Sequence, residues 1–274
     1  MENKRHKILV LSDLKSDTYT MLKSTVGLAK MLDGNIDLFH VKKPTDIVGQ
    51  ESQLSAIRNI NQSYTATGNE IQELTDAVFK NYGVGVSHKY AFGNVKHEIS
   101  EYIQNQQPDV IVIGKRQPKS FGFVGDNITD FVIKNYDGVI MIVDDKNTIE
   151  PEKEFALGFL NSHEELFEAT LSKRLKNNAK KPLRSFQILK SNAQFDTERN
   201  SLEKDIVEYV FEKNDNTINS LGNYLSKNQI NLLYIDRTEQ GTKETHDAKS
   251  LDMNAMISKL KVSFLISSNQ HTQI

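Results

Sequence analysis

The sequence predicts an α/β protein made of two tandem doubly wound parallel sheets of five strands each, the first copy fuller than the second. Short apolar runs rich in β-forming residues alternate with segments of helical periodicity, which is typical of strands covered by helices on both faces. The same order of runs occurs twice along the chain. With 274 residues, of which 38% are hydrophobic, the chain is long enough for two such units.

The first half of the sequence accounts for five strands. We expect them at 7–12, 36–41, 86–91, 109–114 and 139–143. Helices are expected at about 16–33, at 70–83, between Asn94 and Pro108, and around 128–132. The polar stretch 44–67 has no pattern that specifies its structure. Because parallel strands are joined by right-handed crossovers, these elements predict one sheet with helices on both faces.

The second half repeats this order. Its strands are expected at 155–160, 185–190, 206–211, 231–236 and 262–266. Tyr102 and Tyr224 differ by 122 positions, as do Ile113 and Ile235. The second strand gives a larger offset of 149, so about 27 residues are missing between the second and third strands of the second copy. A constant offset with one local deletion indicates duplication, and two unrelated α/β domains are the alternative.

The repeat divides the chain into two domains. We expect the fuller copy over residues 1–146 and the shortened copy, which lacks most of the connection between its second and third strands, over 153–274. The acidic, lysine-containing segment 144–154 is interpreted as the linker between them.

Composition excludes several classes of function. Lys and Arg total 34 against 36 Asp and Glu, so neither nucleic acid nor a membrane is an expected partner. The absence of cysteine excludes disulfides and thiol chemistry. The seven histidines show no metal-site spacing, and His40 fits a hydrogen-bonded core or surface histidine better than a ligand contact. Without a secretory or membrane-spanning pattern, we expect a cytoplasmic protein.

The tips of the first and fourth strands are the candidate ligand site, because doubly wound sheets bind ligands beyond the carboxyl ends of their strands. The first strand is followed by Asp13, and the fourth ends in Gly114. Gly125 allows the loop backbone to approach a ligand closely. The helix that begins near Asp126 and Asn127 offers unpaired N–H groups and a partial positive charge, which suit phosphate.

Each charged residue here also has a structural interpretation. Asp13 is equally well explained as a turn or helix-entry residue. Asp126 fits the N-cap of its helix. Lys115, Arg116 and Lys119 fit a solvated loop better than a phosphate clamp.

Asp13, the run VIVIG and the segment GDNITDFVIKNYDGVIMIV together resemble the universal stress protein family. The resemblance covers the whole first copy and, more faintly, the second. It implies the strand order 3-2-1-4-5 in each copy, with the copies paired through their fifth strands as an intramolecular pseudo-dimer. It also implies a stress-response or regulatory role rather than a dedicated enzyme, with at most weak hydrolysis of a bound nucleotide. The resemblance leaves open whether the chain also forms homodimers and whether it binds a further protein partner.

Nucleotide-binding members of this family carry the motif G-x2-G-x9-G-[ST] after the fourth strand. Gly114 matches its first glycine and Gly125 its last. The residues that the resemblance places around ATP or another adenine nucleotide, with Mg²⁺, are Asp13 at the ribose, Val41 and Ile113 beside the base, and Gly114, Gly125, Asp126 and Asn127 at the phosphates.

The loop departs from the motif in three ways. Gln117 replaces the second glycine, the loop is two positions shorter, and Asp126 replaces the Ser or Thr. A carboxylate beside a phosphate costs about 4 kcal/mol at close range at an effective dielectric near 20, unless a cation such as Mg²⁺ bridges them. The alternative function is therefore an interaction module that keeps the fold and the pseudo-dimer but has lost the ligand site.

The second copy departs further from the motif. Asn161 is aligned with Asp13, and Asp236 replaces Gly114. We expect this copy to bind no nucleotide and to serve as a built-in structural partner.

Overall fold

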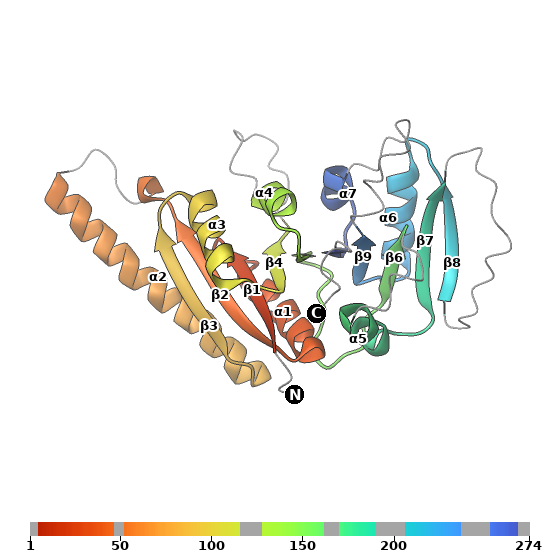
Figure 1. Ribbon diagram of the computed structural model, residues 1–274, viewed down its shortest axis with the longest axis horizontal. Helices are drawn as coiled ribbons and strands as arrows, with labels where there is room; N and C mark the ends of the chain where they lie inside the picture. Colours follow the sequence, from red (N-terminus) through yellow and green to blue (C-terminus); the bar gives the residue numbers. More distant parts are fainter. Residues whose placement is uncertain are drawn as a thin grey trace.

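The protein is described by a computed structural model over residues 5–46, 52–115, 128–161, 170–189, 206–236 and 253–267. Its described strands form one sheet in the order β3-β2-β1-β4-β5-β10-β9-β6-β7-β8 (Figure 1). Each half of this sheet is parallel, and the two halves meet antiparallel at β5 and β10. The predicted order 3-2-1-4-5 and the pairing through the fifth strands are both confirmed.

The first half contains β1 (His6–Ser12), α1 (Thr18–Leu32), β2 (Gly34–Lys42), the 3-10 turn η1 (Pro44–Asp46), α2 (Gln53–Tyr82), β3 (Val86–Phe92), α3 (Val95–Gln106), β4 (Val110–Gly114), α4 (Ile128–Asn135) and β5 (Val139–Val143). The second half contains β6 (Leu157–Leu160), α5 (Thr170–Asn178), β7 (Leu183–Leu189), β8 (Ile206–Glu212), α6 (Thr217–Lys227), β9 (Leu232–Asp236), α7 (Met253–Lys259) and β10 (Ser263–Ser267). The connection from Leu189 to Ile206 is 27 residues shorter than the one from Lys42 to Val86.

Helix α2 is much longer than the sequence predicts, because it begins at Gln53 rather than near residue 70. The side chain of Ser52 caps its first turn by accepting a hydrogen bond from the Ser55 amide. Its buried residues all lie at Thr67 or beyond, and its amino-terminal half extends away from the sheet (Figure 1). Most of that half is exposed, although its Tyr64 ring contacts Tyr90 and Phe92 of β3, so it has little apolar periodicity to detect.

The strand register corrects one predicted equivalence between the copies. Leu160 of β6 and Leu11 of β1 lie opposite equivalent positions of β9 and β4. Asn161 therefore matches Ser12, and its predicted match with Asp13 is wrong by one position. Strands buried on both faces have no alternation of polar and apolar residues, so the sequence pattern does not specify their register.

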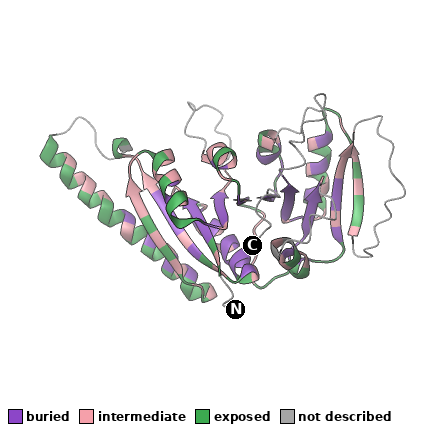
Figure 2. Cartoon of the chain, in the orientation of Figure 1, coloured by how far each residue is buried: buried purple, intermediate pink, exposed green. Residues whose placement is uncertain are grey.

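The antiparallel pair of β5 and β10, which we call the seam between the copies, lies at the centre of the core. Phe264 pairs with Ile142, Leu265 with Met141 and Ile266 with Ile140, and all six side chains are fully buried. Helices α1, α2 and α5 cover one face of the sheet, and α3, α4, α6 and α7 cover the other, so each of the two core clusters spans both copies (Figure 2). Burying a side chain of this size stabilises the fold by roughly 1.5–3 kcal/mol.

The segment 144–154, which joins the two copies, packs along α1. Ile149 is fully buried, and a Cβ added to Gly27 of α1 would lie 3.0 Å from its Cγ2 atom. Glu150 forms an ion pair with Lys23 of α1, and this hydrogen bond holds the pKa of the Glu150 carboxyl below its ordinary value. Among the described residues, no helix is both long and apolar enough to cross a bilayer.

Replacing Ile140 with lysine tests the seam. The substitution places an unpaired charge in the buried strand pair, so we expect the free energy of unfolding to fall by about 4 kcal/mol. Val210, which is 44% exposed on β8, is the control position. Val210→Lys should change the free energy of unfolding by less than about 0.5 kcal/mol. Denaturant unfolding measures both. A wild-type midpoint for Ile140→Lys would contradict the buried seam.

Truncating Ile149 tests the packing of 144–154. Ile149→Ala removes buried methyl groups beside Gly27, so unfolding should become easier by roughly 2–4 kcal/mol. Glu152 lies in the same segment with its side chain 76% exposed, and Glu152→Gln should leave the denaturant midpoint nearly unchanged. Equal midpoints for the two variants would mean that the segment does not pack on α1 in solution.

Candidate functional site

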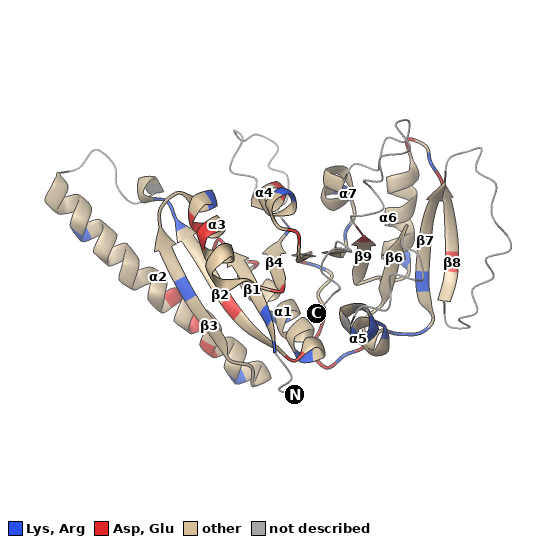
Figure 3. Ribbon diagram, viewed as in Figure 1, with Lys and Arg blue, Asp and Glu red and all other residues tan. Residues whose placement is uncertain are grey.

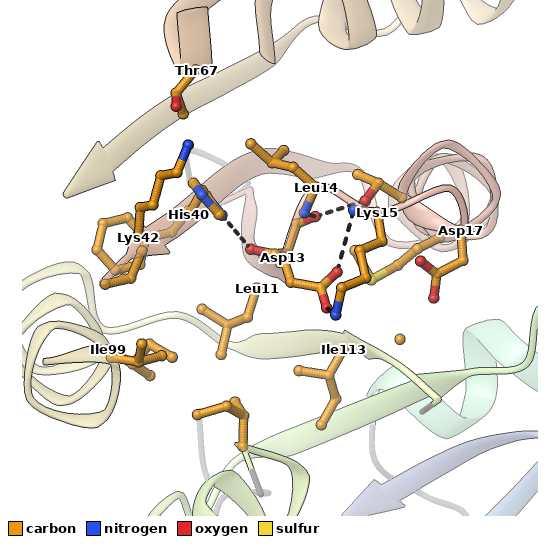
Figure 4. Close-up of a pocket in the computed structure, with 18 of the residues that line it drawn as sticks. Leu11, Asp13, Leu14, Lys15, Asp17, His40, Lys42, Thr67, Ile99 and Ile113 are labelled. Atoms are coloured by element: carbon orange, nitrogen blue, oxygen red, sulfur yellow. Dashed lines mark hydrogen bonds and ion pairs between the residues drawn. The ribbon is translucent and has the colours of Figure 1, made fainter. Parts of the chain in front are cut away.

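A cavity of about 460 Å³ lies at the carboxyl ends of β1, β2 and β4 (Figure 4). Four of the residues predicted for the ligand site line it: Asp13, Val41, Ile113 and Gly114. The other three, Gly125, Asp126 and Asn127, lie outside the described residues. The topology thus brings together side chains from three strands, which is the placement expected of a ligand site in a doubly wound sheet.

One wall of the cavity is apolar. Strand residues that point toward α3 and α4 form it together with residues of α3, and its members include Leu11, Val41, Val95, Ile99 and Ile113. Figure 4 shows Leu11, Ile99 and Ile113 on the same side of the strand tips. Apolar side chains at this position suit a planar ring system.

A stacked pair of rings supports this wall. Phe39 and Tyr102 lie 4.0 Å apart between ring centroids, with their planes inclined by 3°. The Tyr102 hydroxyl donates a hydrogen bond of 2.6 Å to Asp37. Burial, together with this carboxylate, raises the pKa of Tyr102. The Tyr102 ring is therefore held both by stacking on Phe39 and by the hydrogen bond of its hydroxyl.

The opposite wall is polar and carries charges of both signs. The described lining includes the cations Lys15, Lys42 and Lys43, and the carboxylates Asp13, Asp17 and Glu70. Basic and acidic residues are also interspersed along the described helices and strands in this view (Figure 3). The described wall therefore has no net charge that would attract a polyphosphate.

A tight turn after β1 positions Asp13. Ser12 Oγ lies 2.9 Å from Thr18 Oγ1 and accepts a hydrogen bond of 3.0 Å from the Leu14 amide. These bonds hold Leu14 at φ 56°, a left-handed conformation that costs about 1–2 kcal/mol. Asp13 accepts from the Lys15 amide and pairs with its ammonium at 2.7 Å. Asp13 is thus a turn residue and a cavity residue at once.

His40 is a cavity residue that the sequence did not assign to the site. It is 6% exposed, and its Nδ1 lies 2.9 Å from the Ser12 carbonyl oxygen. Because a carbonyl can only accept, Nδ1 carries the proton, and in the neutral ring Nε2 is an acceptor. Burial lowers the pKa of His40, and the bond to Ser12 opposes this shift. The ring is therefore neutral at pH 7.

Asp17 is a second lining residue that the sequence analysis missed. It precedes α1, and a Cβ at Gly114 would lie 3.3 Å from its Oδ2 atom. Its only sequence signal is its position four residues after Asp13. Gly114 thus lets the tip of β4 come close to the start of α1, where a larger residue would crowd this carboxylate. The described residues contain no cluster of side chains able to hold a metal ion.

Lys115 has neither of its predicted roles. Its side chain is only 6% exposed and pairs at 3.2 Å with Asp144, which directly follows β5. It is buried at the seam, so it is neither a solvated loop residue nor a phosphate clamp. Arg116, Gln117 and Lys119 lie outside the described residues.

Aromatic rings also cluster beside α6 in the second copy. Phe186 and Tyr224 repeat the Phe39–Tyr102 pair with centroids 5.5 Å apart, and Tyr209 and Phe211 of β8 pack around them. Asp236, at the tip of β9 where the first copy has Gly114, is 2% exposed.

The sheet order and the strand-tip cavity are accompanied by a direct match to a known family. The model of the universal stress protein family matches residues 4–143, which is half of the chain. The chain belongs to the universal stress protein family. A comparison with curated protein sequences found no match.

Two solved structures share this fold over nearly the whole chain, and a third covers half of the chain. A universal stress protein from Archaeoglobus fulgidus is 11% identical, with a TM-score of 0.68 over 96% of this chain and 98% of that one. A functionally unknown protein from Pseudomonas aeruginosa is also 11% identical, with a TM-score of 0.56 over 96% and 92%. An Arabidopsis thaliana family member with AMP bound is 20% identical, with a TM-score of 0.34 over 50% and 90%.

The lowered pKa of His40 predicts how acid affects this universal stress protein. As pH falls below about 6.5, the unfolded chain takes up the proton first, so stability is lost until the folded-state pKa is reached. One group changes the free energy of unfolding by at most about 1.4 kcal/mol per pH unit. His40→Asn keeps a donor for the Ser12 carbonyl but cannot titrate. The stability of this variant should therefore fall less than that of the wild type as the pH is lowered.

Denaturant unfolding between pH 7.5 and 5 measures the difference between the two proteins. His97→Asn is the control, because that imidazole is 66% exposed on α3 and should behave as the wild type. Parallel stability curves for the wild type and His40→Asn would contradict a buried neutral ring.

Proposed function

We propose that this universal stress protein is a regulatory protein whose first copy binds an adenine nucleotide, ATP or AMP, in the strand-tip cavity. The observation that supports the proposal is the convergence of Asp13, Val41, Ile113 and Gly114 on one cavity. These residues come from segments separated by up to about 100 positions. They are the residues that the family resemblance assigns to the ribose, base and phosphate ends of a nucleotide.

The two walls suggest how the nucleotide would lie. The adenine ring would rest on the apolar wall beside Val41 and Ile113. Asp13 would accept hydrogen bonds from ribose hydroxyls. Breaking its ion pair with Lys15 would cost little, because an exposed ion pair contributes less than about 1 kcal/mol to stability. The phosphates would meet the backbone at Gly114.

Beyond Gly114, the loop and the start of α4 would complete the phosphate end. We assign Gly125, Asp126 and Asn127 to it, with Mg²⁺ bridging Asp126 and the phosphates. Binding rather than catalysis is the proposed activity, with at most slow hydrolysis. We also propose domain limits of 1–146 and 153–274 and a cytoplasmic location.

An interaction module without a ligand is the second candidate. The balanced charge of the described wall and the carboxylate of Asp17 beside Gly114 favour it, because both disfavour a phosphate there. In this case the protein would act through its paired copies and a protein partner.

Calorimetric titration with ATP, ADP and AMP, with and without Mg²⁺, distinguishes these candidates. We expect the wild type to bind at least one of them and Gly114→Val to bind at least tenfold more weakly, because the added side chain projects toward Asp17. Gly85→Val is the matched control, since no atom lies within 4 Å of a Cβ at that exposed position.

Nucleotide released on denaturing the purified protein is measured in parallel. No heat of binding and no released nucleotide would contradict nucleotide binding and favour the interaction module. Equal affinity of Gly114→Val and the wild type would place the ligand elsewhere.

A further inference from the structure

Lys115 is the residue with which the chain leaves β4, and its side chain is buried between the two copies. Its ammonium lies 3.2 Å from Asp144 Oδ2 and also donates to the carbonyl oxygen of Leu260. The same nitrogen lies 5.9 Å from the centre of the Phe264 ring. Leu260 and Phe264 belong to the second copy, so two of these three groups come from across the seam.

The carboxylate that pairs with Lys115 is itself held in place. Asp144 Oδ1 accepts hydrogen bonds of 3.1 Å from the amides of Lys146 and Asn147. The amide of Asp144 donates to Ser263 Oγ at 3.0 Å, and Ser263 belongs to β10. A buried ion pair keeps a single geometry when its remaining hydrogen-bonding groups are satisfied in this way.

The same residue is tied to the cavity through its backbone. The Lys115 amide donates 2.8 Å to the Val143 carbonyl, and Val143 is the register partner of Gly114. Gly114 lines the cavity, whereas Lys115 does not. The backbone of residue 115 therefore borders the ligand site while its side chain is anchored in the second copy.

We propose that Lys115 is a positioning residue through which the second copy holds the tip of β4, and Gly114 with it, in the geometry that accepts the nucleotide. This inference rests on the proposed function. It gives the shortened copy a role in ligand binding. By linkage, the nucleotide must in turn stabilise the part of the second copy that holds Lys115.

Two variants separate positioning from folding. Lys115→Met leaves Asp144 buried without its cation and can fail to fold. The double variant Lys115→Met with Asp144→Leu replaces the pair by apolar side chains of similar size, a change that buried ion pairs often tolerate. Neither methionine nor leucine can donate a hydrogen bond to the Leu260 carbonyl. The hydrogen bond across the seam is therefore lost in the single and the double variant. Lys227→Met, at an exposed lysine of α6, is the control.

The readouts are nucleotide affinity by calorimetry and amide hydrogen exchange of residues 253–267 with and without nucleotide. In the wild type and Lys227→Met, the nucleotide should slow exchange in this segment. In the folded double variant, affinity should fall at least tenfold, and the nucleotide should no longer change the exchange.

A double variant with wild-type affinity and wild-type exchange changes would overturn the inference and leave the proposed function intact. Absence of binding by the wild type would overturn both. Weaker binding with an unchanged exchange response in 253–267 would also contradict the inference, because the loss would then be local to the cavity.

Discussion

The antiparallel pairing of β5 with β10 is the constraint on which the rest of this structure depends. A parallel five-stranded sheet has two exposed edges, and pairing the fifth strands of two copies covers one edge of each. The pairing also joins the cores, because both clusters of buried side chains run through the seam. Neither copy could expose this edge in water without leaving unpaired backbone groups and fully buried residues such as Ile142 and Phe264 uncovered.

The two copies also differ in the side chains that they pack beside their helices. In the second copy, Phe186 and Tyr224 repeat the Phe39–Tyr102 pair. Tyr209 and Phe211 add two rings at positions where the first copy has Lys89 and Ala91. In the first copy, residues of α1, α2 and α3 line the cavity at the strand tips, and Gly114 allows β4 to approach Asp17. The buried pair of Lys115 and Asp144 connects the tip of β4 with the Leu260 carbonyl and the Phe264 ring of the second copy.

Much of the fold was predictable, because the signals that specify it are local. The apolar runs located every strand, and the repeat predicted two units of the same topology. The errors follow from interactions that local patterns do not contain. The amino-terminal half of α2 buries few side chains, so it left little periodicity. The first strands lack a pattern that sets their register, so Asn161 was misaligned with Asp13.

By itself, the sequence determined the duplication, because a repeated order of apolar runs is a local signal. The family resemblance predicted the strand order and four residues that line one cavity. Only the tertiary structure decided which polar groups face the cavity and which are buried at the seam. His40 and Asp17 line the cavity, and Lys115 bonds to Leu260, which is 145 positions away. Whether a polar residue lines the cavity or is buried at the seam depends on which segments contact it in the folded chain. The spacing of residues in the sequence does not indicate those contacts.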